Sequence, residues 1–384
     1  MPKSFQRERF FWVIAIQTAI VNFYIGGFGP AQSLLRTDQG TSLTIAGLHG
    51  TAMGIASIVA GYANPHLAHR FGRIRAGWIG LAIFSTGLIG FVIAPPVYLT
   101  LPATLITGFG TSVVYNSMLT SMSHRYGKAA EVAIPQANAI ASIGFVAGTA
   151  LIGSIAIIFP NLWRIGLLLA IPVAVALFLV GRDKSADDYL PDEAGPQGGK
   201  LSRTFWISWI GFVACISSEF AISFWAAALL KDRVGSSAAI STVAIVALGS
   251  GMGVGRWYSG LVLKRFALDT QLLFVTALQF LGFVAFWFSH SMALSLVSLF
   301  TIGLGISIQF ALASIRLIGF SDARPDLAIG HTSLGVGIAI ATAPFFLGVL
   351  GDSFGISQAY IMVPVLIVIA FTIVKLVPSH PVKE

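Results

Sequence analysis

The chain is a succession of long apolar runs separated by short polar segments. Twelve runs are long enough to cross a bilayer as helices, because a hydrocarbon core about 30 Å thick requires roughly 20 apolar residues. They lie approximately at 10–32, 44–68, 74–95, 97–122, 130–158, 163–181, 204–230, 237–262, 270–289, 291–318, 325–350 and 355–377. Open strands are excluded from lipid, since each unpaired backbone group costs several kcal/mol there. The pattern therefore predicts an all-α membrane protein with twelve transmembrane helices.

Composition and charge support this prediction. The chain of 384 residues is 56% hydrophobic and 10% charged, whereas a soluble domain carries about 25% charged residues. Its single cysteine, Cys215, lies inside an apolar run, which excludes an internal disulfide and a cysteine-based metal site. The net charge of +8 falls in the segments between apolar runs. We interpret it as a signal of membrane orientation and expect no nucleic-acid partner.

Lysine and arginine are distributed unevenly between the two sides of the membrane. If the N-terminus is cytoplasmic, 18 basic residues lie in inner segments and 4 in outer loops, with Arg256 left near the inner end of the eighth run. Cytoplasmic segments carry an excess of Lys and Arg. We therefore expect both termini in the cytoplasm and a multi-pass protein of a cell inner or plasma membrane, of bacterial type.

One long polar stretch divides the chain into two halves. Residues 182–203 are rich in Asp, Pro and Gly and predict a flexible cytoplasmic linker. The linker separates an N-terminal six-helix bundle, 1–181, from a C-terminal six-helix bundle, 204–384.

A constant offset of 195 residues brings the two halves into register, which indicates a duplication. The matched positions include Phe10 and Phe205, Gly54 and Gly249, Arg70-Phe71 and Arg265-Phe266, Gly108 and Gly303, and Gly153 and Gly348. Both halves start on the same side of the membrane. Parallel halves of this kind place a substrate path at their interface, near the midplane.

The loop between the second and third runs carries a recognisable motif. It reads Pro65-His-Leu-Ala-His69-Arg70-Phe71-Gly72-Arg73-Ile74-Arg75. With the twelve runs and the central linker, it resembles the major facilitator superfamily (MFS), whose loop motif runs Gly-x-x-x-Asp-Arg-x-Gly-Arg-Arg/Lys. Arg70, Gly72 and Arg73 match the motif, whereas Pro65 and His69 replace its Gly and Asp. The resemblance covers essentially the whole chain and implies the MFS fold, alternating access and a monomer.

In the superfamily, the loop Asp helps to latch the cytoplasmic gate. Because His69 replaces it here, we expect acidic partners for the gate arginines at the inner starts of the fifth and eleventh helices, where the helix dipole favours a carboxylate. The predicted gate residues are Arg70, Gly72, Arg73, Glu131, Arg256, Arg265 and Asp326. Ordinary interfacial charges set by topology are the alternative interpretation.

Glu219 is the acidic residue that the pattern places near the bilayer centre, about halfway along the seventh run. A charge at that depth costs at least about 2.5 kcal/mol, so such a group usually faces a cavity or an internal partner. Burial favours the neutral form of a carboxyl, and a carboxyl that gains and loses a proton can couple transport to a proton gradient. We predict that Glu219 is a proton-coupling site or a direct ligand of a polar or cationic substrate. A protonated structural glutamate is the alternative.

Polar and aromatic side chains at similar depth form the predicted substrate-binding surface. In the superfamily, helices 1, 4, 7 and 10 line the cavity, and the offset of 195 matches Glu219 with Tyr24. The candidates are Asn22, Tyr24, Tyr115, Asn116, Asn138, Trp225 and Gln309. An amide in hydrocarbon needs a partner, so hydrogen bonding between helices is the alternative for the polar ones. For Trp225 the alternative is packing.

Together these expectations predict a secondary active transporter that moves a small organic solute by alternating access, is coupled to protons through Glu219, and is not an enzyme. We expect a neutral or weakly cationic solute, because no unpaired arginine is placed at the midplane to hold an anion. An uncoupled uniporter, a proton-driven efflux pump for drugs or metabolites, and a transporter-like sensor are the alternatives. The expected partners are the solute, protons and the lipid bilayer, with no cofactor and no metal.

Overall fold

The computed structural model describes residues 6–93, 95–182, 199–263, 265–322 and 324–379. Within these residues the chain forms helices and no strand. The N-terminal half contains α1 Arg9–Phe28, α2 Gln32–Gln39, α3 Leu43–Phe71, α4 Arg73–Ile93, α5 Val97–Tyr126, α6 Ala130–Ile158, α7 Trp163–Leu167 and α8 Ala170–Gly181. The C-terminal half contains α9 Arg203–Val234, α10 Ala238–Ala244, α11 Val246–Val262, α12 Leu268–Phe288, α13 Met292–Ile306, α14 Gln309–Gly319, α15 Pro325–Phe354, α16 Ile356–Ala359 and α17 Met362–Leu376.

Twelve helical segments in the described residues are long and apolar enough to cross a membrane. Several shorter helices join end to end into one span, as α7 with α8 and α13 with α14 do. The all-α fold class and the twelve spans predicted from the sequence are confirmed. The linker predicted at 182–203 lies largely outside the described residues, and α9 begins at Arg203.

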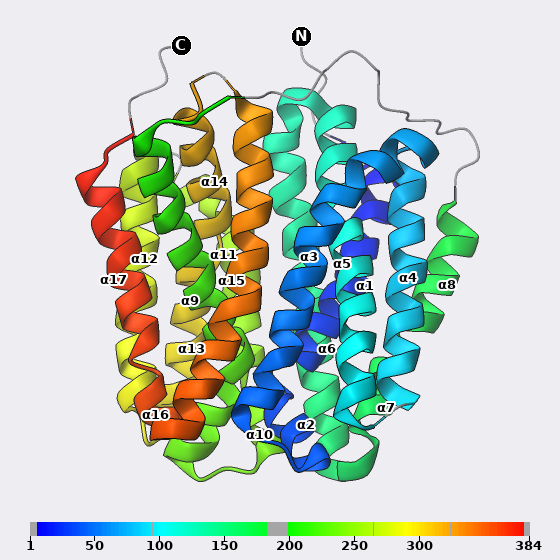
Figure 1. The fold of residues 1–384 in the computed structure, drawn as a ribbon, viewed down its shortest axis with the longest axis vertical. Helices are drawn as coiled ribbons and strands as arrows, with labels where there is room; N and C mark the ends of the chain where they lie inside the picture. The colour runs from blue at the N-terminus through cyan, green and yellow to red at the C-terminus, as the bar shows by residue number, and fades with distance from the viewer. Residues whose placement is uncertain (1–5, 94, 183–198, 264, 323, 380–384) are drawn as a thin grey trace.

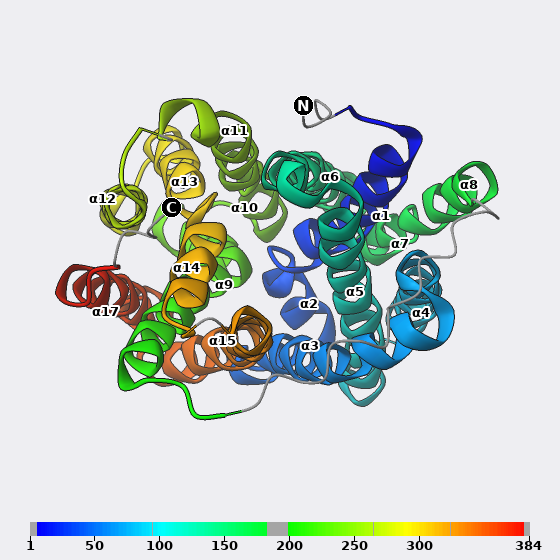
Figure 2. The same ribbon diagram turned by 90° about the horizontal axis from the view of Figure 1, so that it is seen from above.

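The two halves of the chain stand side by side, with their helices running along the long axis of the molecule (Figures 1 and 2). They meet along two seams, where α3 packs on α15 and where α6 packs on α10 and α11. The start of α1 and the end of α17 lie at the same end of the molecule, at the top of Figure 1. We call this end the terminal face and the opposite end the distal face.

The repeat of 195 residues extends to the signals that begin and end helices. Gly40 and Gly235 both adopt positive φ at the C-terminal ends of α2 and α9, where glycine carries no Cβ penalty. Ser42 and Ser237, two residues later in each half, both cap the next helix by accepting a hydrogen bond from a backbone N–H. The two halves therefore use the same turn chemistry at equivalent positions.

The seam between α3 and α15 depends on a close approach at Gly54. A Cβ added there would overlap the backbone of Ala341 and lie 2.5 Å from the carbonyl oxygen of Gly337. Small residues allow this approach, which lipid-embedded helices use to gain packing contacts. Helix α15, which packs against α3 in this seam, also carries Gly330, where an added Cβ would have nothing within 4 Å.

We predict that Gly54→Val destabilises the purified protein, whereas Gly330→Val changes its stability little. Overpacking a close contact typically costs about 1–3 kcal/mol, and the two variants add the same side chain. Thermal unfolding in detergent measures the difference. Equal melting temperatures for the two variants would show that the close approach at Gly54 does not contribute to stability.

Candidate functional site

Glu219 lies midway along α9, on a helix that is otherwise mostly buried. The adjoining residues Ser217, Ser218, Ala221 and Ile222 are buried, whereas the Glu219 side chain is partly exposed. Within the described residues, its carboxyl group makes no hydrogen bond and no ion pair with another side chain. Glu219 is thus an accessible acidic group deep within a membrane-spanning helix.

Arg256, on α11, connects the two halves of the molecule. Its Nη1 donates to Ser142 Oγ on α6 at 2.7 Å and lies 3.5 Å from the carbonyl oxygen of Asn138. Its Nε donates to the carbonyl oxygen of Ser307 at 3.2 Å. The guanidinium also lies close enough to Glu219 for its charge to act on that carboxyl group. All three of its hydrogen-bond acceptors are neutral, and Glu219 is an acidic group within electrostatic range of it.

The helix break between α13 and α14 supplies one of these acceptors. The tenth membrane span is interrupted at Ser307 and Ile308, and an interruption leaves backbone carbonyls without helical donors. Gly255 permits the contact, because a Cβ there would lie 2.6 Å from Ser307 Cβ. The close approach of α11 to the break therefore places the guanidinium of the next residue, Arg256, against an available carbonyl.

Two side chains of the N-terminal half complete this arrangement. Asn22 on α1 donates to the Tyr115 hydroxyl on α5 and also to the carbonyl oxygen of Thr18 at 2.9 Å. The charges of Arg256 and Glu219 both act on Tyr115. We call Asn22, Tyr115, Glu219 and Arg256 the central polar cluster. It draws on both halves of the chain and offers an acid, a cation, a hydroxyl and an amide.

Three other candidates from the sequence are packed within the protein. Tyr24 is buried and stacked on Phe28, with ring centroids 5.0 Å apart. Trp225 is buried, and its indole N–H donates to the carbonyl oxygen of Pro344 at 2.9 Å. Gln309 is 1% exposed. In this conformation these side chains hold helices together, and a role in substrate contact stays a prediction. Asn116 and Asn138 are partly exposed.

Gln309 belongs to a buried chain of hydrogen bonds beneath Glu219. Its Nε2 donates to Gln279 Oε1 at 2.8 Å, and Gln279 Nε2 donates to Ser218 Oγ at 3.0 Å. Ser218 Oγ donates to the carbonyl oxygen of Cys215 at 2.7 Å. Gln279 is not among the residues predicted from the sequence, although an amide inside the apolar run at 270–289 is a signal for such a contact. This series of hydrogen bonds holds the turn of α9 that carries Glu219.

The predicted gate residues lie in several places. Arg70 and Arg265 each lie over the ring of the next residue, at 5.3 Å and 5.1 Å from its centroid. Gly72 adopts a positive φ of 85° where α3 ends, and Arg73 is buried. Arg256 belongs to the central polar cluster and does not lie with the gate residues of the loop between α3 and α4. The side chains of Glu131 and Asp326 lie outside the described residues, so the proposed acidic partners stay a prediction.

The distal ends of the two halves are held together by direct contacts. Both carboxylate oxygens of Asp352, near the end of α15, accept backbone N–H groups at the start of α3, from Leu43 at 2.9 Å and from Thr44 at 2.8 Å. Phe28 on α1 packs edge-on against Phe224 on α9 at 6.3 Å. These contacts join the two halves near the distal face.

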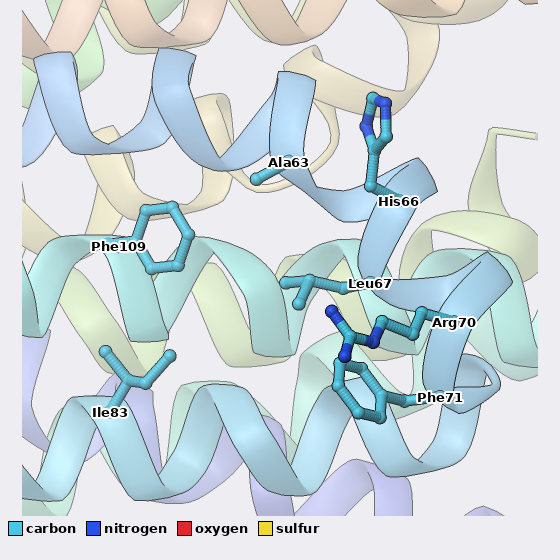
Figure 3. A pocket seen from close by; sticks show the side chains of 7 residues that line it. All are labelled: Ala63, His66, Leu67, Arg70, Phe71, Ile83 and Phe109. Atoms are coloured by element: carbon cyan, nitrogen blue, oxygen red, sulfur yellow. The ribbon is translucent and has the colours of Figure 1, made fainter.

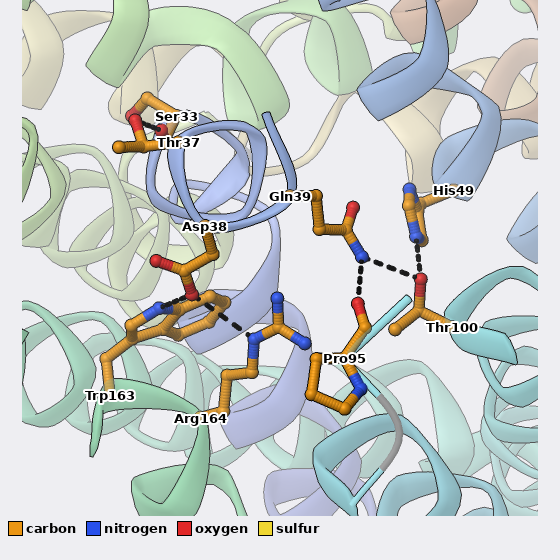
Figure 4. A network of polar contacts seen from close by, with 9 residues as sticks. All are labelled: Ser33, Thr37, Asp38, Gln39, His49, Pro95, Thr100, Trp163 and Arg164. Atoms are coloured by element: carbon orange, nitrogen blue, oxygen red, sulfur yellow. Dashed lines mark hydrogen bonds and ion pairs between the residues drawn. The ribbon is translucent and has the colours of Figure 1, made fainter. Parts of the chain in front are cut away.

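A second polar network supports this end of the N-terminal half (Figure 4). Asp38 on α2 accepts hydrogen bonds from Trp163 Nε1 at 2.7 Å and from Arg164 Nε at 3.3 Å. Gln39 Nε2 donates to Thr100 Oγ1 at 3.0 Å, and Thr100 Oγ1 is also 2.9 Å from His49 Nε2. The network fastens the short helix α2 to α3, α5 and α7.

Comparisons with known proteins agree with this architecture. The family model of the Major Facilitator Superfamily matches residues 14–318. A crystal structure of the nucleoside transporter NupG, in a mutant form, superposes with a TM-score of 0.76 at 12% identity, covering 95% of this chain and 100% of that one.

A bacterial homolog of the human lysosomal transporter Spinster is similar as well. Its inward-facing, occupied structure gives a TM-score of 0.72 at 14% identity, covering 97% of each chain. Its inward-facing, unoccupied structure gives 0.70 at 14% identity, covering 96% of each chain. At these identities the likeness shows the fold alone. No protein among those with curated functions matches the sequence. The family model, which spans most of the chain, shows that the protein belongs to the Major Facilitator Superfamily of membrane transporters.

Proposed function

We propose that this protein is a secondary active transporter that moves a small organic solute by alternating access, coupled to protons through Glu219. One observation carries the proposal: Glu219 is partly exposed and unpaired among the described side chains, and it lies within electrostatic range of Arg256, the side chain that bridges α11 and α6. An ionisable group inside a membrane span usually marks a substrate or proton pathway.

The charge balance of the central polar cluster supplies a coupling mechanism. When Glu219 is ionised, its negative charge offsets that of Arg256, and interactions of this kind are strong where water is excluded. When Glu219 gains a proton, Arg256 keeps only neutral partners, and an uncompensated charge in such surroundings is unfavourable. Protonation therefore favours a solute that brings an acidic or strongly accepting group to the guanidinium.

The position of Arg256 changes the solute class that we propose. From the sequence we expected a neutral or weakly cationic solute, because Arg256 was placed near the inner end of its helix. In the structure its guanidinium reaches Ser142 on α6 and acts on Glu219. Guanidinium groups bind carboxylates through paired hydrogen bonds, and Asn22 and Tyr115 lie nearby for further polar contacts. A small organic acid fits this arrangement better than a cation does.

The two seams and the distal contacts support the alternating-access cycle that we propose. The contacts at Asp352 join the halves near the distal face, which supports a proposal that Glu219 is reached from the terminal face in this conformation. We place the terminal face in the cytoplasm, because basic residues are concentrated at that end of the spans. Rocking of the halves about the α3–α15 and α6–α11 seams would then expose the cluster to the other side.

We predict that small organic acids stabilise the wild-type protein more at lower pH, as long as the solute stays ionised, because protonation of Glu219 leaves Arg256 free to bind it. A thermal-shift screen of organic acids, amino acids, nucleosides and amines at two pH values measures this. Glu219→Gln mimics the protonated state, so binding persists and its pH dependence disappears. In proteoliposomes the same variant keeps solute exchange and loses accumulation driven by a pH gradient.

The matched control is Glu8→Gln, because Glu8 forms an exposed ion pair with Arg125 at 2.9 Å, far from the cluster. This variant should behave like the wild type. Gradient-driven accumulation that survives in Glu219→Gln would contradict proton coupling through this residue and indicate a uniporter or another coupling site.

We predict that Arg256→Gln weakens binding of the solutes found in the screen by at least about tenfold, since hydrogen bonds to charged groups contribute about 1.5–3 kcal/mol. Arg256→Lys keeps the charge but not the paired geometry, so its affinity should be intermediate. Titration by calorimetry measures the affinities, with Arg125→Gln as the control. Unchanged affinity in a folded Arg256→Gln protein would remove Arg256 from the binding site.

A further inference from the structure

A pocket of about 360 Å³ lies between α3, α4 and α5, separate from the central polar cluster (Figure 3). Its lining residues are Ala63, His66, Leu67, Arg70, Phe71, Ile83 and Phe109. None of them belongs to the C-terminal half or to the central polar cluster. The walls are apolar, and the strongest polar group is the guanidinium of Arg70.

The pocket adjoins a surface of α3 that faces away from the protein. Ile55, Val59 and Tyr62 are exposed along this helix at 46%, 51% and 71%, and their spacing of three and four residues puts them on one face. In a membrane-spanning helix, exposed apolar residues of this kind contact acyl chains. The pocket at Ala63 and Leu67 continues this face toward the terminal face of the molecule.

The Arg70 side chain turns back along the pocket. Figure 3 shows its guanidinium beside Leu67 and over the ring of Phe71, directed away from the end of α3, while the His66 ring at the rim is turned away from it. Within the described residues, Arg70 makes no hydrogen bond and no ion pair. Its five N–H donors are therefore available to a ligand.

The depth of Arg70 matches the level of lipid headgroups. Helix α3 has 29 residues, and roughly 20 residues cross the hydrocarbon core. About four residues are left at each end, so Arg70, next to the last residue of α3, lies in the interfacial layer. A phosphate at that level meets the guanidinium, and a chain attached to the phosphate extends along the apolar walls toward the midplane.

We propose that this pocket binds an anionic glycerophospholipid of the leaflet on the terminal side. Arg70 holds the phosphate through the paired hydrogen bonds that guanidinium groups form with such oxyanions, and Leu67, Ile83 and Phe109 enclose one acyl chain. At about 30 Å³ for each water-sized group, the pocket accommodates on the order of ten methylene groups. That capacity corresponds to a large part of one chain.

The duplication provides a matched control within the same molecule. Arg265 and Phe266 are the counterparts of Arg70 and Phe71 at the offset of 195, and they make the same contact between guanidinium and ring. The pocket includes no residue near Arg265. An effect of general surface charge would involve both arginines, whereas binding in the pocket involves Arg70 alone.

The test measures thermal stability of the full-length protein in nonionic detergent with added phosphatidylglycerol or phosphatidylcholine at equal mole fraction. Because a ligand of the folded state raises its stability, we expect a larger upward shift with phosphatidylglycerol for the wild type and for Arg265→Gln. Arg70→Gln should lose at least half of the difference between the two lipids. Native mass spectrometry should show fewer retained phosphatidylglycerol molecules on Arg70→Gln.

A second variant tests the apolar part of the site. Ala63→Phe fills the pocket and keeps Arg70, so it should also lose the phosphatidylglycerol difference, provided that its stability in phosphatidylcholine matches the wild type. Inorganic phosphate should give no shift. The proposal is overturned if Arg70→Gln keeps the difference, if Arg265→Gln loses it equally, or if inorganic phosphate alone reproduces it.

Discussion

A polar group within a membrane-spanning helix must find its partner inside the protein, because acyl chains offer neither donors nor acceptors. Many of the described side chains obey this constraint, although some buried hydroxyl groups, such as those of Thr111 and Ser298, have no hydrogen-bond partner among the described residues. The buried amides of Gln279 and Gln309 bond to each other and to Ser218, and Asp352 accepts two backbone N–H groups. Glu219 departs from the pattern, since its carboxyl group is accessible and has no hydrogen-bond partner among the described residues. The proposed coupling site rests on this unpaired, partly exposed carboxyl group in the middle of a span.

The charged centre and the contacts between the halves are physically linked. Arg256 lies on α11, reaches Ser142 across the seam with α6, and acts electrostatically on Glu219 of α9. A change in the charge of Glu219 is therefore felt by a side chain that joins the two halves. The α3–α15 seam combines the close backbone approach at Gly54 with a hydrogen bond from Thr51 Oγ1 to the carbonyl oxygen of Ala341 at 2.7 Å. In the proposed mechanism, proton binding and movement of the halves therefore involve neighbouring groups.

The duplicated halves share local structure but differ in what surrounds it. Gly40 and Gly235 end equivalent helices with the same backbone conformation. Tyr24 and Glu219 occupy matching positions, yet the tyrosine is buried in a stack of aromatic rings and the glutamate is accessible. Arg70 and Arg265 make the same contact with an adjacent ring, while the pocket between α3, α4 and α5 is lined by Arg70 and, among the described residues, not by Arg265. In each pair, the function that we propose comes from the asymmetry between the halves.

The sequence by itself determined the number, type and order of the membrane spans, because each span is a local run of apolar residues whose length the bilayer sets. It also located Glu219 at mid-depth, since depth follows from position along a helix. Only the tertiary structure decided which side chains face the centre. Most spans are apolar on all sides, so the sequence carries no signal for their rotation, and Trp225 and Gln309 proved to be packed inside. The reach of Arg256 depends on the helix break at Ser307 and on the approach of α11, two features created by packing between distant segments.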